Sequence, residues 1–303
     1  MNTTGNKILN FIVNPNAGRG KATRAMKKIA AYLDRQKLVH KIHFADTSEQ
    51  ARDIARGLER AGEDTIIAVG GDGTFSEVIN GVRNLSGVTF GFIPAGTGND
   101  LVKTLDLPCK PLLALKHILS DKTDTIDYLQ GKCRRALNIV STGFDVDVLK
   151  RFNASGIRNK LTYYHSLLKC ILKFDYYKSD ITLDGKDPVR REFFLVAATN
   201  GRYFGSGMHI SPNAGIQDGK INTIVINSMP KSRVFRAALR FIKGKHIHDD
   251  YVEEYLTDHI VLDTGKRMTL DFDGELIEDE FDIKIVPNGL KIFFDPDLAS
   301  KRV

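Results

Sequence analysis

Cysteine is scarce in this sequence, and its placement excludes two common uses of the residue. Cys109, Cys133 and Cys170 are an odd number, lie far apart and form no C-x-x-C pair. Neither a disulfide framework nor a zinc site is therefore supported. The chain also lacks an apolar run near the ~18 residues that a membrane-spanning helix needs, and its first residues lack the apolar core of a signal peptide. We expect an intracellular, reducing location.

The chain has only a small excess of one charge. It contains 44 Lys and Arg against 37 Asp and Glu, a formal net charge of +7. This excess suits an anionic lipid surface or a nucleic acid, but many soluble proteins reach it without such a partner. A hydrophobic content of 42% and a charged content of 27% are ordinary for a folded protein. The length of 303 residues predicts two domains.

The two standard phosphate-binding fingerprints are also missing. No G-x-x-x-x-G-K-[ST] occurs, and no G-x-G-x-x-G follows the central predicted strand, residues 64–69. That strand is followed instead by Gly70-Gly71-Asp72-Gly73-Thr74 and then by apolar residues at helical spacing. Thr74 and Glu77 stand in the S/T-x-x-E relation, which predicts a helix that begins at Thr74.

The order of strand, glycine turn and helix start favours an anion site. A helix N-terminus offers unpaired N–H groups and a partial positive charge. Gly71 and Gly73 would let a phosphate approach closely and would tolerate a positive φ. Asp72 would repel phosphate unless a cation lies between them, so Mg²⁺ is expected with a nucleotide. The alternative at this point is a tight turn with a surface aspartate.

Two more glycine-rich loops follow predicted strands. Residues 7–13 form a strand that leads into Asn14-Pro15-Asn16-Ala17-Gly18-Arg19-Gly20-Lys21 and then a helix. Residues 88–94 form another, which leads into Ala95-Gly96-Thr97-Gly98-Asn99-Asp100 and a helix from Leu101. Residues 42–44 are a short strand, and a helix begins at Thr47. This alternation predicts a parallel sheet with its ligand at the carboxyl ends of the strands.

The second half of the chain has a different pattern. After about residue 124 come short alternating runs separated by turns, which predict an antiparallel sandwich. The expected strands include residues 125–128, 135–140, 179–183, 193–198, 220–226, 267–272 and 281–286. Two helices are predicted, a basic and aromatic one over residues 157–177 and an amphipathic one over residues 233–243.

These loops together resemble the catalytic domain of diacylglycerol kinase-like lipid kinases. Sphingosine kinases, NAD kinases and phosphofructokinases share a Gly-Gly-Asp-Gly-type loop, but a Pro-x-Gly-Thr-x-Asn-Asp segment, here residues 94–100, is typical of the lipid branch. Residues 200–220 resemble the second-domain signature of bacterial members, apart from Ser206, where a third glycine is usual. Asp273-Gly274-Glu275 resembles the turn that carries the family's general base. The resemblance covers nearly the whole chain.

The resemblance implies a fold and a division into domains. Residues 1–125 would form a doubly wound parallel-sheet domain of the NAD kinase type that binds ATP. Residues 126–303 would form an antiparallel β-sandwich domain that binds lipid. A return of the last residues to the first domain stays open, and the active site would lie in the cleft between the domains.

The resemblance also implies roles for particular residues. Asp273 would accept the proton of the acceptor hydroxyl, and Asp72 and Asp100 would bind the Mg²⁺ that accompanies ATP. A second, structural metal would lie near Asp218, with the backbone carbonyls of Gly215 and Lys220. The residues expected at ATP are Asn14, Pro15, Asn16, Ala17, Gly18, Thr47, Gly71, Asp72, Gly73, Thr74, Phe75, Ser76, Glu77, Thr97 and Glu275.

Two other features have simpler interpretations. His246 and His248 flank Ile247 and suggest a metal, but with no further ligand at suitable spacing a packing or solvated role is favoured. The helix over residues 233–243 is expected to pack its apolar face on its own domain. For the helix over residues 157–177, packing and membrane docking both stay open.

We expect an ATP-dependent lipid kinase that converts diacylglycerol into phosphatidic acid. The alternatives are a kinase of another hydroxyl lipid, such as phosphatidylglycerol or a sphingoid, an NAD kinase, or a catalytically silent regulator that binds lipid or nucleotide. The intact set of Asp72, Asp100 and Asp273 argues against the regulator. The expected cofactors are ATP and Mg²⁺, and the expected partner is a membrane surface bound peripherally from the cytoplasm. No nucleic-acid partner is expected, and a homodimer stays open.

Overall fold

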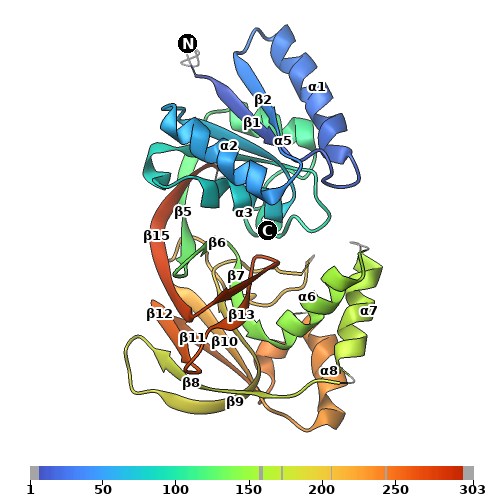
Figure 1. Cartoon of the computed structure of the whole chain (residues 1–303), viewed down its shortest axis with the longest axis vertical. Coiled ribbons are helices and arrows are strands. Elements are labelled where there is room, and N and C mark those ends of the chain that lie inside the picture. Colours follow the sequence, from blue (N-terminus) through green and yellow to red (C-terminus); the bar gives the residue numbers. More distant parts are fainter. Residues whose placement is uncertain (1–6, 157–159, 172, 206, 243, 296–303) are drawn as a thin grey trace. The chain divides into compact units, whose positions relative to one another are not determined.

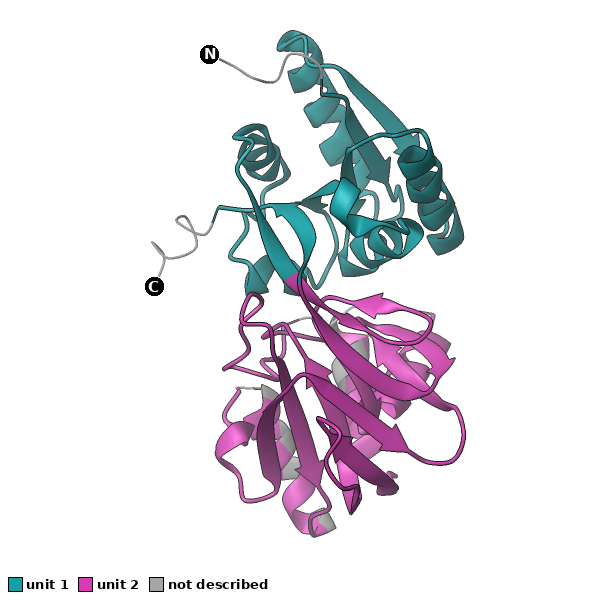
Figure 2. Cartoon of the chain, turned by 90° about the vertical axis from the view of Figure 1, so that its left-hand side faces the viewer, with its two compact units in different colours: residues 1–126, 288–303 teal, residues 127–287 magenta. Residues whose placement is uncertain are grey.

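The structure, a computed structural model, describes residues 7–156, 160–171, 173–205, 207–242 and 244–295. Arg158, Ser206 and Lys243 lie outside the described residues. The chain divides into two compact units (Figure 2). Unit 1 contains residues 1–126 and 288–303, and unit 2 contains residues 127–287. The chain passes from one unit to the other within β5 (Thr123–Gln130) and again within β15 (Phe281–Phe293).

Unit 1 is built on a parallel sheet, as the alternation of strands and helices predicts. The strand order is β2-β1-β3-β4-β15, and each neighbouring pair is parallel. The inner strands β1, β3 and β4 are buried along their whole length, which explains their continuous apolar sequences. The strands that lie wholly within unit 1 are β1 (Leu9–Val13), β2 (His40–Phe44), β3 (Thr65–Gly70) and β4 (Thr89–Pro94).

Helices cover both faces of this sheet (Figure 1). On one face, α1 and α5 share a core cluster with Phe11 of β1 and Ile93 of β4. On the other face, Phe75 of α3 stacks on Phe92 of β4 with the ring centroids 4.9 Å apart. The helices are α1 (Lys21–Arg35), α2 (Ser48–Arg60), α3 (Asp72–Gly81), α4 (Asp100–Thr104), α5 (Pro111–Leu119) and the 3-10 turn η1 (Leu85–Gly87).

Unit 2 is an antiparallel β-sandwich domain, as predicted. Its strands pair in the order β14-β13-β7-β9-β8-β12-β15, with β10 beside β9 and β11 beside β10. The remaining bounds are β6 (Arg135–Ala136), β7 (Ile139–Gly143), β8 (Tyr177–Leu183), β9 (Val189–Thr199), β10 (Ile221–Asn227), β11 (Val252–Thr257), β12 (His259–Asp263), β13 (Met268–Phe272) and β14 (Glu275–Asp279).

In the described part of unit 2, three helices and a 3-10 turn accompany the sheet. They are α6 (Phe144–Ala154), α7 (Lys160–Ile171), α8 (Lys231–Ile242) and η2 (His246–His248). A second core cluster joins α6, α7 and α8 to the sheet. Val234, Ala237 and Phe241 of α8 belong to it, so the prediction that this helix packs its apolar face on its own domain is confirmed. The helix α6 was not predicted.

Candidate active site

Three glycine-rich loops meet at the carboxyl edge of the unit 1 sheet. The first follows β1, the second joins β3 to α3, and the third follows β4. The side-chain amide of Asn14, in the first loop, donates to the Thr74 hydroxyl at 3.4 Å. The backbone N–H groups of Ala95 and Gly96, in the third loop, donate to the carbonyl of Gly70 at 2.6 and 3.0 Å. The prediction that the loops share one edge is confirmed.

Glycine is required where these loops approach one another. A Cβ on Gly96 would lie 2.4 Å from the Cα of Gly71, and a Cβ on Gly18 would lie 2.1 Å from the carbonyl oxygen of Ala95. Gly18 also has a φ of +56°. The expected positive φ at Gly71 and Gly73 is wrong, because Gly71 has a φ of −100° and Gly73 is not among the positive-φ residues. Gly71 provides space for the third loop.

The helix α3 begins at Asp72, two residues earlier than predicted. Gly71 is its N-cap, and the Gly71 carbonyl accepts the N–H of Phe75 at 3.2 Å. The predicted capping box is wrong, since Thr74 already lies inside the helix and Glu77 pairs with another helix. The first turn of a helix leaves its N–H groups without carbonyl partners and carries a partial positive charge. The loop edge is therefore suited to a phosphate.

Three of the residues expected at ATP point into the interior of unit 1. Phe75, Ser76 and Glu77 are each at most 2% exposed. The Glu77 carboxylate is held by the Arg52 guanidinium of α2 at 2.6 Å. The side chains of Phe75 and Glu77 therefore fix α3 against the sheet and against α2, and the expectation that Phe75, Ser76 and Glu77 lie at ATP stays a prediction.

The other expected ATP residues lie in the loops or beside them. Thr47 caps α2, as predicted, with its hydroxyl oxygen accepting the N–H of Gln50 at 3.2 Å. The Asn14 carboxamide oxygen accepts the N–H of Asn16 at 3.0 Å, which shapes the first loop. Asn16 and Thr97 are exposed, while Pro15, Ala17, Gly18 and Gly73 are partly buried.

Asp72 and Asp100 bring two carboxylates to the same loop edge. Asp72 accepts the backbone N–H of Leu101 at 3.2 Å, which joins the second loop to α4. Asp100 is mostly buried and forms an ion pair with Lys103 at 2.8 Å. Among the residues that the structure describes, no three His, Cys, Asp or Glu side chains group as a metal site. Two carboxylates nevertheless fit a Mg²⁺ ion that takes its other ligands from phosphate and water.

In unit 2, Asp273 lies in the turn between β13 and β14. Asp273 and Gly274 have φ values of 52° and 94°, as the two central residues of a type I′ hairpin turn require. The Asp273 carboxylate accepts three backbone N–H groups, from Leu137 at 2.6 Å, Asn138 at 2.9 Å and Ile139 at 3.0 Å. Both carboxylate oxygens therefore bind backbone N–H groups, whose positions do not depend on the rotamer of any side chain.

The surroundings of Asp273 shift its pKa in opposite directions. Burial raises the pKa of this carboxyl, and the three amide donors, together with Arg134, lower it. Burial has the larger effect, so the pKa of Asp273 lies above its ordinary value. A carboxylate with a raised pKa is a stronger base than a free one.

Family models match both halves of this architecture. The diacylglycerol kinase catalytic domain matches residues 9–131, and the YegS C-terminal NAD kinase beta sandwich-like domain matches residues 138–294, more than half of the chain. The chain belongs to the diacylglycerol kinase-like lipid kinase family. The protein is therefore a kinase, and membership of this family implies the use of ATP.

Relatives and solved structures agree with this assignment. A Staphylococcus aureus protein named "Putative lipid kinase" is 27% identical over 298 residues, covering 94% of each chain. A crystal structure described as a "putative diacylglycerol kinase" from Bacillus anthracis shares the fold with a TM-score of 0.76 at 23% identity, covering 96% of this chain and 98% of that one. An Archaeoglobus fulgidus NAD kinase shares it with a TM-score of 0.52 at 13% identity, covering 98% of each chain. The predicted fold class is confirmed.

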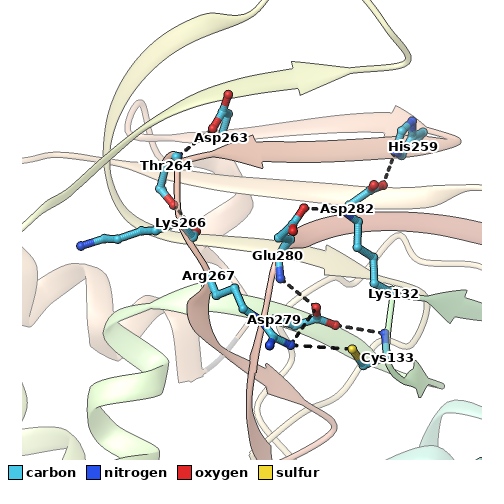
Figure 3. A network of polar contacts seen from close by, with 11 residues as sticks. Lys132, Cys133, His259, Asp263, Thr264, Lys266, Arg267, Asp279, Glu280 and Asp282 are labelled. Atoms are coloured by element: carbon cyan, nitrogen blue, oxygen red, sulfur yellow. Dashed lines mark hydrogen bonds and ion pairs between the residues drawn. The ribbon is translucent and has the colours of Figure 1, made fainter.

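The hairpin that carries Asp273 in the kinase is anchored along its length. Beside the turn, Glu275 pairs with Arg134 at 3.0 Å, so the carboxylate that was expected at the nucleotide has a partner within unit 2. At the far end (Figure 3), the buried Asp279 accepts the N–H of Cys133 at 3.1 Å and lies 3.7 Å from the Arg267 guanidinium. These contacts join the hairpin to the segment around Cys133.

Unit 2 of the kinase also contains an apolar cavity that was not predicted. It lies between α6, α7, α8 and the sheet and has a volume of about 60 Å³. Large apolar side chains line it, among them Phe144, Phe194, Phe204, Met208, Met229 and Phe241. They come from segments up to about a hundred positions apart, so no local pattern marks the cavity.

Two buried carboxyls near the Asp273 turn were also missed. Asp145 is 4% exposed and Asp271 is 3% exposed. The one sequence signal for Asp271 is a charged residue between Leu270 and Phe272 in a predicted strand. Nothing in the sequence places Asp145 beside it.

The predicted structural metal site of the kinase maps to a tight loop in unit 2. Asp218 accepts the N–H of Lys220 at 2.9 Å, and a Cβ on Gly215 would lie 2.6 Å from an Asp218 carboxylate oxygen. Burial raises the pKa of Asp218, with the charge of Asp127 adding to it, while N–H groups of Lys220 and Gly215 lower it. A bound cation would favour the ionised form. The metal here stays a prediction.

The two histidines of η2 differ in their surroundings. His246 is 1% exposed, donates its Nε2–H to the carbonyl of Ile210 at 2.8 Å, and packs against the ring of Phe241. Burial lowers the pKa of His246 to about 4, so it is neutral near pH 7. His248 is exposed. The packing and solvated roles favoured from the sequence agree with this placement.

Proposed function

We propose that this kinase transfers the γ-phosphate of ATP to the hydroxyl of a membrane lipid, with diacylglycerol as acceptor and phosphatidic acid as product. The observation that supports a lipid acceptor is the apolar cavity of unit 2, lined by six aromatic and methionine side chains among others. A volume of about 60 Å³ is only about twice that of one water molecule in the liquid, so an acyl chain can enter only if the lining helices move apart.

The three loops of unit 1 bind the ATP phosphates in this proposal. Phosphoryl transfer asks the protein mainly for positioning and for neutralisation of charge. The backbone around Gly71 and Gly73 and the start of α3 supply N–H donors, and the missing side chains let the phosphates come close. Asn14, Gly18 and Thr97 form the opposite wall.

Asp72 and Asp100 would hold the Mg²⁺ that accompanies ATP. The ion would neutralise charge on the phosphate oxygens and orient the transferred group. The chain's own contribution is to keep both carboxylates at the loop edge, Asp72 through Leu101 and Asp100 through Lys103.

Asp273 would take the proton of the acceptor hydroxyl. The amides of Leu137, Asn138 and Ile139 fix the orientation of its carboxylate, so its free lone pairs keep one direction. Burial raises its pKa, which brings its basicity closer to what proton transfer near pH 7 needs.

The helix α7 supports the proposed peripheral membrane contact. Leu161 and Leu168 are two helical turns apart and are 81% and 50% exposed, and Lys169 beside them is exposed. Exposed apolar side chains with a cation suit an anionic lipid surface. In the described part of the chain, none of the helices has the length and apolarity required to span a bilayer.

Vesicle co-sedimentation tests this surface. We expect Leu161→Ser with Leu168→Ser to weaken binding to vesicles that contain an anionic lipid, at low salt. The matched control is Leu256→Ser, which changes an equally exposed leucine, 64% exposed, on β11 of the same unit. Equal binding of the α7 variant and the parent would exclude α7 as the docking surface.

The proposed activity is tested with radiolabelled ATP and a panel of acceptors in mixed micelles. The panel contains diacylglycerol, phosphatidylglycerol and a sphingoid base, with NAD in the aqueous phase. We expect label in phosphatidic acid, and about 10²–10⁴-fold slower labelling with Asp273→Asn. Label in another lipid would replace the named acceptor, and an unlabelled panel would overturn the proposal.

A further inference from the structure

A cluster of buried polar side chains lies directly behind the Asp273 turn. Asp271 on β13 stands opposite Ser141 on β7 in the strand register. The Ser141 hydroxyl donates to the carboxylate of Asp145 on α6. All three side chains are at most 4% exposed. Residues opposite each other on paired strands share a face of the sheet, so Asp271, Ser141 and Asp145 gather on one side of β7 and β13.

Asp271 bonds to the turn itself. Its carboxylate accepts the backbone N–H of Gly274 at 2.6 Å. Gly274 is the second central residue of the turn whose first is Asp273, and both have a positive φ. Positive φ is costly for an aspartate, so this turn needs contacts that hold it. Asp271 supplies one from the strand, and the amides that bind the Asp273 carboxylate supply the others.

The two buried carboxyls repel each other when both are ionised. Asp145 also lines the apolar cavity, and its Oδ1 finds no hydrogen-bond partner among the described residues. Burial raises the pKa of Asp145 to about 6 despite the Ser141 hydroxyl. Burial, with the charge of Asp145, raises the pKa of Asp271 well above its ordinary value. The titratable groups that act on the pair from α6, β8, the turn and β14 are Asp147, Tyr177, Asp273 and Glu275.

We propose that Asp271 is a positioning residue for the base, and that Asp145 and Asp271 hold the Asp273–Gly274 turn as a pair of which one carboxyl is protonated. The effect on activity rests on the proposed function, because it takes Asp273 as the base, whereas the effect on folding does not. Loss of this proton to solvent at alkaline pH leaves two like charges in a buried site. Their repulsion draws Asp271 away from the N–H of Gly274 and loosens the turn.

The effect on stability has a definite sign. A carboxyl with a higher pKa in the folded than in the unfolded state binds more protons when folded, so stability is lost as the pH rises through the folded pKa. For Asp145 the loss begins above its ordinary value of 3.8 and continues through about 6, and Asp271 extends it to higher pH. Asp145→Asn removes one of the two charges, and with it the part of this loss that comes from Asp145 and from its repulsion of Asp271.

The first test follows the melting temperature between pH 5 and pH 9 without substrate. We expect the parent to lose about 2–4 °C or more relative to Asp145→Asn as the pH rises. The matched control is Asp279→Asn, a buried aspartate at the other end of the same hairpin, for which we expect an offset that does not change with pH. A constant difference between the parent and Asp145→Asn would overturn the proposal.

The second test follows lipid phosphorylation. Asp271→Asn keeps an oxygen acceptor for Gly274, so we expect its kcat at pH 7 to stay within about threefold of the parent and to fall less at pH 9. Asp271→Leu removes the acceptor, and we expect kcat to drop at least about tenfold with the Kd for ATP unchanged, since the loops that bind ATP lie in unit 1. A kcat of Asp271→Leu equal to that of the parent would exclude the positioning role.

The two tests separate this proposal from the proposed function. If the parent labels no lipid, the proposed function fails, while the melting profile still decides whether the pair binds a proton in the folded protein. If the parent is active and its melting profile has the same pH dependence as that of Asp145→Asn, the proposal for Asp145 and Asp271 is wrong and the proposed function stands.

Discussion

The two candidate functional regions of the molecule differ in the groups that they present. The loop edge of unit 1 is made of backbone, with Gly18, Gly71 and Gly96 leaving room where a side chain would collide. The Asp273 turn of unit 2 is made of carboxyls, each oriented by amides or by a buried neighbour. The first region suits a ligand that is already charged. The second suits a step in which a proton moves.

This difference explains what each region tolerates. In the loops of unit 1, a side chain added to a glycine takes up space between the loops, so we expect the affinity for the nucleotide to fall. At Asp273 of unit 2, a change of carboxyl to amide keeps the size of the side chain and removes its basicity, so we expect a loss of kcat and not of nucleotide affinity. The predictions below test this separation, from the largest effect to the smallest.

The largest effect is expected for Asp273→Asn. The amide keeps the side-chain shape but cannot accept the hydroxyl proton, so we expect kcat to fall by about 10²–10⁴, the range for loss of a general base. The Kd for ATP, measured by calorimetry, should stay within about twofold. Turnover of the purified variant within a few-fold of the parent would show that Asp273 is not the base.

A smaller effect is expected when the loops of unit 1 are forced apart. The added methyl of Gly96→Ala would lie 2.4 Å from the Cα of Gly71, and crowding of this kind costs about 1–3 kcal/mol. We expect the Kd for ATP to rise about tenfold to a hundredfold.

Gly71→Ala is the matched control, because its Cβ would lie 3.2 Å from the Cα of Gly96. We expect Gly71→Ala to raise the Kd for ATP less than Gly96→Ala does. We also expect its melting temperature to stay close to that of the parent while its Kd for ATP rises. An equal Kd for ATP in Gly96→Ala and the parent would show that these loops do not bind the nucleotide.

Filling the apolar cavity should affect the lipid and leave ATP binding unchanged. Ala237 of α8 lines the cavity, and the phenyl group added by Ala237→Phe would more than fill it. We expect the KM for diacylglycerol to rise about tenfold while the Kd for ATP stays constant. The control is Ala55→Phe, which crowds the buried face of α2 in unit 1 and should lower stability without a selective change in the lipid KM. An unchanged KM for diacylglycerol in Ala237→Phe would show that the cavity does not bind the lipid.

The smallest effect concerns the pair between Arg52 and Glu77. Arg52→Met keeps much of the apolar stem but leaves the Glu77 carboxylate, 1% exposed, without its guanidinium partner at 2.6 Å. We expect a loss of about 1–3 kcal/mol in the free energy of unfolding, measured by denaturant, and an unchanged Kd for ATP. If the free energy of ATP binding falls by more than the free energy of unfolding, Glu77 contributes to nucleotide binding.

The fold and the phosphate edge could be predicted because their signals are local. A buried strand, a glycine loop and a helix repeat three times within the first hundred residues, and the parallel topology brings the loops to one edge. The start of α3 was missed because Thr74 and Glu77 match a local capping pattern, whereas the N-cap is Gly71, which lies against the third loop and has no capping side chain.

The surroundings of Asp273 could be predicted only in part. The Asp-Gly turn is a local signal, but the amides that bind its carboxylate lie about 135 positions earlier in the chain. Asp145 and Asp271 are separated by a similar distance in sequence, and their meeting depends on the pairing of β7 with β13. Long-range strand pairing has no signature within a short window of sequence.

The central claim, that this kinase phosphorylates a lipid hydroxyl, is tested most directly by a competition in one tube. The purified protein is given radiolabelled ATP, Mg²⁺, mixed micelles that contain diacylglycerol, and NAD in excess in the aqueous phase. We predict that the label enters the lipid fraction as phosphatidic acid and that its rate of entry rises with the mole fraction of diacylglycerol in the micelle. Label in NADP with none in the lipid fraction would contradict the account.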